Sequence, residues 1–147
     1  MSETVKIAVF GLGGRGQSLI EYAILPACQD MNAEIAAVYD PYEDRTQESA
    51  AIVERITGKR PIAAKSEDEI FSNPEIKAVI VSSSWESHID LAVKSMRAGK
   101  YVAFEVGGAY ALEDCWRLVN TSEETGVPCM MLENCCYGHR ELMITNM

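Results

Sequence analysis

A glycine-rich turn directly after an apolar run constrains the fold of this chain more than any other feature. In the segment VKIAVFGLGGRG, an apolar strand leads into Gly11, Gly13 and Gly16 with the spacing G-x-G-x-x-G. The apolar positions after the turn have helical spacing and are Leu19, Ile20, Ala23 and Ile24. In such a unit, the first glycine permits the turn, the second lets a pyrophosphate approach, and the third allows close helix packing. The helix N-terminus offers N–H groups to an anion, so the segment favours a dinucleotide site.

An acidic residue follows the second apolar run, where this motif places a ligand for a ribose. The run EIAAVYD ends in Asp40, about 20 residues beyond the turn, and a carboxylate there accepts hydrogen bonds from the adenosine ribose. The alternative is structural, with glycines that only turn the chain and an Asp40 that caps the helix after Pro41. The order of strand, turn, helix and distal acid favours the first interpretation, with NAD as the cofactor.

Short apolar runs alternate with stretches of helical period along the rest of the chain. The expected strands are 5–10, 34–39, 61–64, 78–82, 101–105 and 129–132. Helical spacing of apolar residues is found at Ile89, Ala92, Val93 and Met96, at Leu112, Cys115, Trp116 and Val119, and more weakly at Ile52, Val53 and Ile56. This pattern predicts an α/β fold, namely a doubly wound parallel sheet of about six strands with helices on both faces, the Rossmann dinucleotide-binding fold.

Composition excludes several classes of function. The 147 residues include 22 acidic and 13 basic side chains, and the net charge of -9 disfavours a nucleic-acid partner. No stretch approaches the roughly 18 apolar residues of a membrane helix, and MSETVKIAVF lacks a signal-peptide pattern, so we expect a cytoplasmic protein. Five cysteines without C-x-x-C spacing, and only two histidines, predict buried reduced thiols and no metal site.

Polar residues follow three of the expected strands, at the edge where a doubly wound sheet binds its ligands. The fourth strand continues into SSSWESH, the fifth ends in Glu105-Val106-Gly107-Gly108, and the sixth ends in Glu133-Asn134. We expect these segments to border one crevice, where Ser83 and its neighbours bond the nicotinamide half and Trp85 packs against the cofactor. The alternatives are a local hydrogen bond for His88 at a helix N-terminus and a partly buried core position for Trp85.

Five segments together resemble a known family. These are GLGGRG, Asp40-Pro41, SSSWESH, RAGKYVAFEVGGA and MMLENCCYG. They are similar to the N-terminal cofactor domain of the glucose-fructose oxidoreductase, inositol dehydrogenase and MocA (Gfo/Idh/MocA) family over nearly the whole chain. The W-x-x-H spacing and CMMLENCCY most resemble a branch with NAD-dependent α-N-acetylgalactosaminidases.

The resemblance implies a role for each matching residue. Gly14, Arg15 and Gly16 would lie at the pyrophosphate and Asp40 at the adenosine ribose. The nicotinamide half would be bordered by residues 85–88 (Trp85 to His88), Glu105, Val106 and Asn134. The family's oxidoreductases usually have Glu-Lys-Pro after the fifth strand, with the lysine at the substrate, whereas this chain has Val106 there. Because valine cannot exchange a proton, His88 and Tyr137 become the catalytic candidates, and ordinary alcohol dehydrogenation is put in doubt.

Three functions remain open at this stage. The leading hypothesis is an NAD-binding domain of an oxidoreductase that takes a hydride from a carbohydrate or polyol. The branch resemblance implies instead a glycosidase, in which oxidation at sugar C3 acidifies the C2 proton, the aglycone is eliminated, water adds, and reduction closes the cycle. The third is a non-catalytic NAD-binding or redox-sensing module.

The domain organisation follows from the absence of any linker or repeat. We expect residues 1–147 to form one dinucleotide-binding domain, with GHRELMITNM as the start of a further amphipathic helix. Members of the family carry a second, substrate-binding domain, and nothing in this sequence corresponds to it. We therefore expect the isolated chain to bind cofactor without turnover, and the full-length protein to form homo-oligomers.

Overall fold

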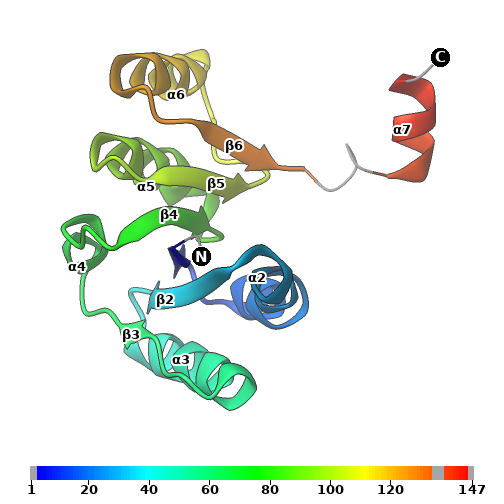
Figure 1. Cartoon of the computed structure of the whole chain (residues 1–147). Helices are drawn as coiled ribbons and strands as arrows, with labels where there is room; N and C mark the ends of the chain where they lie inside the picture. The colour runs from blue at the N-terminus through cyan, green and yellow to red at the C-terminus, as the bar shows by residue number, and fades with distance from the viewer. Residues whose placement is uncertain (1–2, 134–137, 146–147) are drawn as a thin grey trace.

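The predicted parallel sheet is confirmed. The structure is a computed structural model that describes residues 3–133 and 138–145. Within these residues, six parallel strands form one sheet in the order β3-β2-β1-β4-β5-β6, so that β1 lies in the middle (Figure 1). The strands are β1 (Val5–Phe10), β2 (Ala33–Tyr39), β3 (Ile62–Ala63), β4 (Ile76–Val81), β5 (Tyr101–Glu105) and β6 (Cys129–Leu132). Each boundary lies within two residues of its predicted position.

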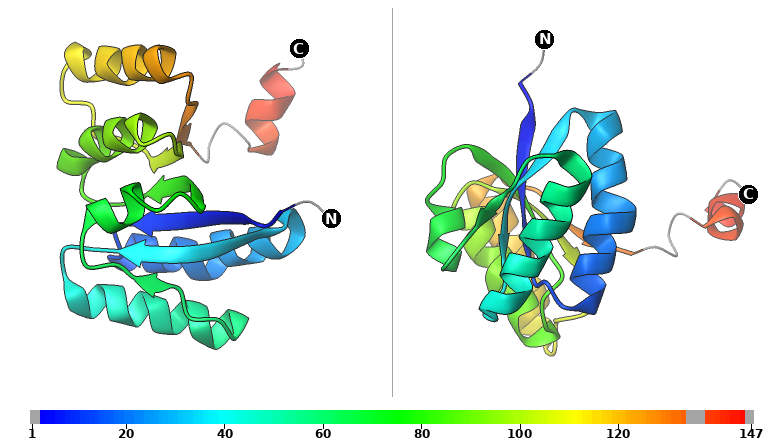
Figure 2. Two further views of the ribbon diagram at one scale, coloured as in Figure 1. Left: turned by 60° about the vertical axis from the view of Figure 1, so that its left-hand side comes forward. Right: turned by 90° about the horizontal axis from the view of Figure 1, so that it is seen from below.

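Helices cover both faces of the sheet, as the alternation of strands and helices predicts (Figure 2). One face carries α1 (Gly14–Leu19), η1 (Ile20–Ile24), α2 (Leu25–Met31) and α3 (Glu43–Thr57). The other carries α4 (Glu67–Phe71), α5 (Trp85–Arg97) and α6 (Leu112–Thr125). Helix α7 (His139–Thr145) lies apart from the sheet (Figure 1). Among the described residues, no helix is both long and apolar enough to cross a membrane.

The first helical stretch changes its winding before a proline. Residues 14–31 are helical throughout, but 20–24 form a π-turn in which the N–H of Leu25 donates to the carbonyl of Ile20. Pro26 follows directly, and a proline has no N–H to donate to the carbonyl four residues earlier. The wider turn therefore accommodates the proline without ending the helix.

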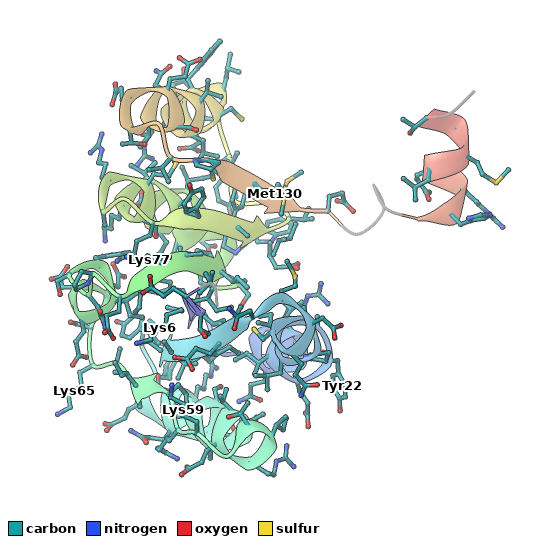
Figure 3. All side chains as sticks on the ribbon, viewed as in Figure 1. Lys6, Tyr22, Lys59, Lys65, Lys77 and Met130 are labelled. Carbon is teal, nitrogen blue, oxygen red and sulfur yellow. The ribbon has the colours of Figure 1, made fainter. Side chains whose placement is uncertain are left out.

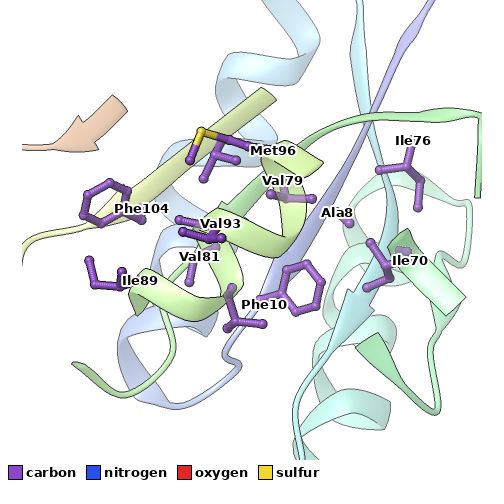
Figure 4. Packing of buried hydrophobic residues seen from close by; sticks show 14 of the residues in the cluster. Ala8, Phe10, Ile70, Ile76, Val79, Val81, Ile89, Val93, Met96 and Phe104 are labelled. Carbon is purple, nitrogen blue, oxygen red and sulfur yellow. The ribbon is translucent and has the colours of Figure 1, made fainter. Parts of the chain in front are cut away.

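Each face of the sheet has its own apolar core within the described residues. Alternate residues of β1 separate them, since Ala8 and Phe10 pack toward α5 while Ile7 and Val9 pack toward α1 to α3. On the α5 side, Phe10 stacks on Phe71 with ring centroids 5.5 Å apart, and β4, β5 and α5 supply most of the other members (Figure 4). These two layers fix the strands, and with them the turns that follow each strand.

One face of β5 and β6 has no helix over it within the described part of the chain. Met130 points to this face (Figure 3), Tyr101 lines it as well, and the two residues are 50% and 58% exposed. The face continues into an apolar cavity of about 530 Å³ that runs beneath η1 and α2 and ends at Arg15 and Glu105. We call this surface the open face.

The prediction that one apolar stripe of α6 covers the sheet is wrong in part. Leu112, Trp116 and Val119 are exposed, and Leu118 instead packs against the core. Helix α6 lies over β6, the last strand at the edge of the sheet. Only a narrow part of the sheet therefore lies against this helix, and much of its apolar stripe stays exposed. The same geometry leaves Cys115 exposed, which corrects the expectation of buried thiols.

The other thiols differ from Cys115 in their surroundings. Cys28 and Cys129 are free and half-buried, and burial raises the pKa of both thiols, that of Cys129 to about 11. Cys135 and Cys136 lie outside the described residues.

Candidate functional site

The glycine turn after β1 is fixed by contacts that only glycine allows. Gly11 has φ +83°, and a Cβ built on it would lie 2.2 Å from the backbone nitrogen of Ser83. A Cβ on Gly16 would lie 1.9 Å from the carbonyl oxygen of Gly11. Ser82 donates its hydroxyl to that same carbonyl at 2.8 Å. The first and third glycines of the motif thus hold the turn tightly against the end of β4.

The middle of the turn faces open space. A Cβ on Gly13 would meet only Arg45 Nη1 at 3.9 Å, and one on Gly14 would meet nothing within 4 Å. Gly13 precedes the first helical residue and accepts the N–H of Gln17, while the first N–H groups of a helix have no acceptor within it. The backbone here fits an anion such as the pyrophosphate of a dinucleotide.

Asp40 is buried at the end of β2 and bonds the glycine turn directly. The carboxylate, in a residue that is 6% exposed, accepts the N–H of Leu12 at 2.7 Å and the N–H of Tyr42 at 3.0 Å. Thr46 fixes the Asp40 backbone, because its hydroxyl accepts the N–H and donates to the carbonyl. A carboxylate offers about four acceptor positions, so Asp40 retains capacity for ribose hydroxyls after these two bonds.

One cation lies beside Asp40. Arg45 Nη1 is 3.9 Å from Asp40 Oδ1, and the guanidinium lies over the Tyr42 ring at 4.4 Å from its centroid. The arginine is about half exposed and so is available to an incoming ligand. A buried carboxylate and a half-exposed guanidinium therefore lie side by side at the end of β2.

The turn after β4 is organised by hydroxyls and by a buried histidine. Ser87 donates to the hydroxyl of Ser83 at 2.7 Å. His88 is 1% exposed, with Nε2 at 2.9 Å from the Ser83 carbonyl and Nδ1 at 3.5 Å from the Gly107 carbonyl. The ring therefore connects the turn after β4 to the turn after β5. Gly108 lies so close that a Cβ there would approach His88 Cβ to 2.6 Å.

Trp85 and Glu86 begin α5 on the exposed side of that turn. Trp85 is 57% exposed, and its indole lies 2.7 Å from the position that a Cβ on Gly107 would occupy. The pKa of Glu86 is lowered by a hydrogen bond from its own backbone N–H and then by the Ser84 hydroxyl. Tyr110 donates to this carboxylate at 3.5 Å. An exposed aromatic side chain and an ionised carboxylate therefore lie next to each other at the start of α5.

Glu105, the last residue of β5, forms an ion pair with the glycine turn. Arg15 Nη2 donates to Glu105 Oε1 at 2.9 Å, with side chains that are 59% and 17% exposed. Val106 follows and is partly exposed. The sequence analysis assigned Arg15 to the pyrophosphate and Glu105 to the nicotinamide half. Because the two residues are 90 positions apart, no local sequence pattern predicts that they form a pair.

The structure brings most of the predicted site residues to one edge of the sheet. Gly11 to Gly16, Asp40, Ser83, Trp85, His88, Glu105 and Val106 all lie in or next to the turns after β1, β2, β4 and β5. Asn134 and Tyr137 lie outside the described residues. The sequence analysis missed Ser82 and Thr46, whose hydroxyls bond the backbone of the turns. The sequence feature that could have indicated them is a hydroxyl residue directly after a strand, as for Ser82, or in the first turn of a helix, as for Thr46. No group of three potential metal-binding side chains occurs in the described part of the chain.

Comparison with known proteins agrees with this geometry. The model of the Gfo/Idh/MocA oxidoreductase family, NAD-binding Rossmann fold, matches residues 5–133. A glycosyl hydrolase family 109 protein from Solibacter usitatus is 42% identical over 98% of this chain and 33% of its own length. Another, from Akkermansia muciniphila, is 41% identical over 99% of this chain and 30% of its own length. The chain thus spans about a third of the length of these relatives.

A solved structure shows the same fold at lower identity. The enzyme GenD2 of gentamicin A biosynthesis, solved in complex with NAD, has a TM-score of 0.81 and 23% identity, covering 99% of this chain and 39% of its own. The fold is therefore shared with an NAD complex.

Proposed function

The chain belongs to the Gfo/Idh/MocA oxidoreductase family as an NAD-binding Rossmann domain, and on that premise we propose that the whole protein is an NAD-dependent glycoside hydrolase. When bound, NAD accepts a hydride from a carbohydrate carbon and, once reduced, can return it. The proposed substrate is an α-N-acetylgalactosaminide. Between the two hydride transfers the aglycone would be eliminated and water would add in its place, so that no net oxidation results.

The observation that carries the cofactor site is the open backbone of Gly13 and Gly14 beside the buried carboxylate of Asp40. The turn receives the pyrophosphate, and Asp40 orients the adenosine ribose. Ser83 and Glu105 border the nicotinamide half, and Trp85 gives it an exposed aromatic surface. Each of these groups lies at the end of a strand or in the short segment that follows it, which favours an ordered cofactor.

Two observations favour hydrolysis over net dehydrogenation. The relatives that cover nearly the whole chain at 41–42% identity are named as glycosyl hydrolases. The side chain after Glu105 is Val106, which cannot handle a proton. Proton transfer then falls to His88 and Tyr137, and the buried His88 ring reaches a substrate only when the turns around it open.

The proposal also covers the location and the assembly of the protein. We place the protein in the cytoplasm, because Cys28, Cys115 and Cys129 are free thiols. Substrate contacts come from a second domain beyond this Rossmann domain, and the full-length protein forms homo-oligomers through exposed apolar surface such as Trp116.

Activity assays of the full-length protein separate the candidate functions. Incubation with NAD and an aryl α-N-acetylgalactosaminide should release the phenol with no accumulation of NADH. Accumulation of NADH with a sugar or polyol would instead identify a net dehydrogenase, which the family description also supports. NAD binding without turnover of either class would identify a non-catalytic module. Residues 1–147 alone should bind NAD and turn over neither substrate, since one wall of the crevice cannot orient a sugar.

A further inference from the structure

The Arg15–Glu105 ion pair spans the site from one side to the other. Arg15 is the second residue of α1, at the end of the glycine motif that follows β1, and Glu105 ends β5. Strand β4 lies between them in the sheet, so the pair reaches across the width of a strand. Glu105 is mostly buried while Arg15 is largely exposed, which means that the carboxylate is fixed by the sheet and the arginine reaches toward it.

We infer that Arg15 and Glu105 are a positioning pair that sets the separation between the pyrophosphate and nicotinamide halves of the site. This inference rests on the proposed binding of NAD at the glycine turn. It gives Arg15 a role that differs from a direct phosphate contact, because its guanidinium is bonded to Glu105 at 2.9 Å.

The other contacts of the turn explain why such a pair is needed. Asp40 holds the turn toward β2 through the N–H of Leu12, and Ser82 holds it toward β4 through the carbonyl of Gly11. Among the side-chain hydrogen bonds that the described residues of this segment form, only that of Arg15 reaches β5, the strand whose end borders the proposed nicotinamide half. Without this bond, the two halves are connected only through β4 and its following turn.

The ion pair also fixes the direction of Glu105. The Arg15 guanidinium donates to Glu105 Oε1 at 2.9 Å, which holds the carboxylate at the end of β5 beside the proposed nicotinamide half. Removing Arg15 therefore leaves Glu105 free to turn away from that position, whereas a neutral Glu105→Gln side chain can still accept a hydrogen bond from Arg15.

The test compares two ligands that differ in their reach. NAD spans both halves of the site, whereas ADP occupies only the adenosine and phosphate part. Dissociation constants of both are measured by calorimetry for wild type, Arg15→Gln, Glu105→Gln, Arg15→Lys and the double variant Arg15→Gln/Glu105→Gln. We expect Arg15→Gln to weaken NAD binding about tenfold and ADP binding less than twofold, with a smaller NAD-selective loss for Glu105→Gln. The double variant should bind NAD no worse than Arg15→Gln, and Arg15→Lys should regain part of the affinity.

A matched ion pair far from the site provides the control. Arg117 pairs with Asp90 between α6 and α5, and its side chain is similarly exposed. Arg117→Gln should change neither dissociation constant, and exposed ion pairs contribute little to stability, so all variants should remain folded by circular dichroism.

Specific results would overturn the inference. Equal loss of ADP and NAD affinity in Arg15→Gln would show a direct phosphate ligand. If the loss of NAD affinity in the double variant equals the product of the two single losses, Arg15 and Glu105 act on NAD binding independently. If the variants bind NAD like wild type, the positioning role of the pair is wrong while the proposed cofactor site stands. If the wild-type protein binds neither nucleotide, this inference and the proposed cofactor site are both wrong.

Discussion

The two halves of the binding edge are built differently. Around Gly11 and Asp40, polar groups bond backbone groups of the neighbouring turn, and both faces of β1 and β2 are packed. Around Trp85 and Val106, the side chains are exposed, and one face of β5 and β6 carries no helix in the described part of the chain. In the proposed site, the nucleotide end is therefore the packed part of this edge, whereas the reacting end is bordered by exposed side chains.

This difference matches the chemistry of the two ends. The adenosine and pyrophosphate parts of NAD are the same in every reaction, so backbone groups held by glycines can recognise them. The nicotinamide end must meet a particular substrate, and the exposed side chains of Trp85 and Val106 border it in the proposed site. If the two ends differ in this way, substitutions in the glycine turn should lower stability or NAD affinity, whereas substitutions on the open face should be tolerated.

Among the variants at the binding edge, the largest effect should come from Gly11→Ala. The positive φ of +83° and a Cβ only 2.2 Å from the Ser83 backbone leave no room for a side chain, so we expect the free energy of unfolding to fall by about 3 kcal/mol or more. Urea denaturation measures this, with Gly14→Ala as the control, because a Cβ on Gly14 meets nothing within 4 Å. Equal stability of the two variants would mean that the turn is not fixed as described.

Gly13→Val should separate binding from folding. The side chain points into open space, so stability should change little, but it would occupy the approach of the pyrophosphate. We expect NAD binding to weaken by roughly 100-fold, equivalent to about 2.7 kcal/mol. Calorimetry or NADH fluorescence measures the loss, and unchanged binding would place the cofactor site elsewhere.

The preference for NAD over NADP tests the roles of Asp40 and Arg45 at the adenosine end. The Asp40 carboxylate can accept from a ribose 2′-hydroxyl and would repel the extra phosphate of NADP, so wild type should prefer NAD at least about tenfold. Asp40→Asn should reduce that preference while Arg45→Gln should increase it, because Arg45 lies 3.9 Å from the carboxylate and could pair with the phosphate. Equal affinity for NAD and NADP in wild type would show that Arg45 outweighs Asp40.

A pH-dependent effect is expected in β6. Burial raises the pKa of the Cys129 thiol from 9.0 to about 11, so the folded state favours the neutral form. Its contribution to stability is complete below pH 9 and is lost as the pH rises toward 11. After discounting for partial solvent exposure, the loss should be on the order of 1 kcal/mol. Cys129→Ala should flatten the pH dependence of the unfolding free energy over this range, and an unchanged slope would count against a dry environment at β6.

The smallest effect should come from the open face. Met130→Lys places a charge on a residue that is 50% exposed, so the free energy of unfolding should change by no more than about 0.5 kcal/mol. Val9→Lys, on the covered part of the same face, should prevent folding because Val9 is fully buried. Severe destabilisation by Met130→Lys would show that the open face is covered in solution.

The sequence predicted the elements that depend on local pattern. The strands and the glycine turn have local signatures, and Asp40 follows at a fixed place in the motif. The burial of His88 and the Arg15–Glu105 pair depend instead on how turns from distant strands meet, which no local spacing contains. Helical spacing at Leu112, Trp116 and Val119 shows which residues share a face but not whether anything lies against that face, and this is where the prediction of α6 was wrong in part.

The central position of β1 has a consequence for how the protein is made. Strand β1 is synthesised before β2 and pairs with it early, but its other neighbour is β4, with Lys6 opposite Ile76. Until β4 and α5 have been synthesised, Ala8 and Phe10 present an apolar surface with no partner, and β1 has one unpaired edge. Folding must therefore wait for contacts between distant parts of the chain, which makes it slow compared with a helical bundle and leaves the nascent chain dependent on protection from aggregation.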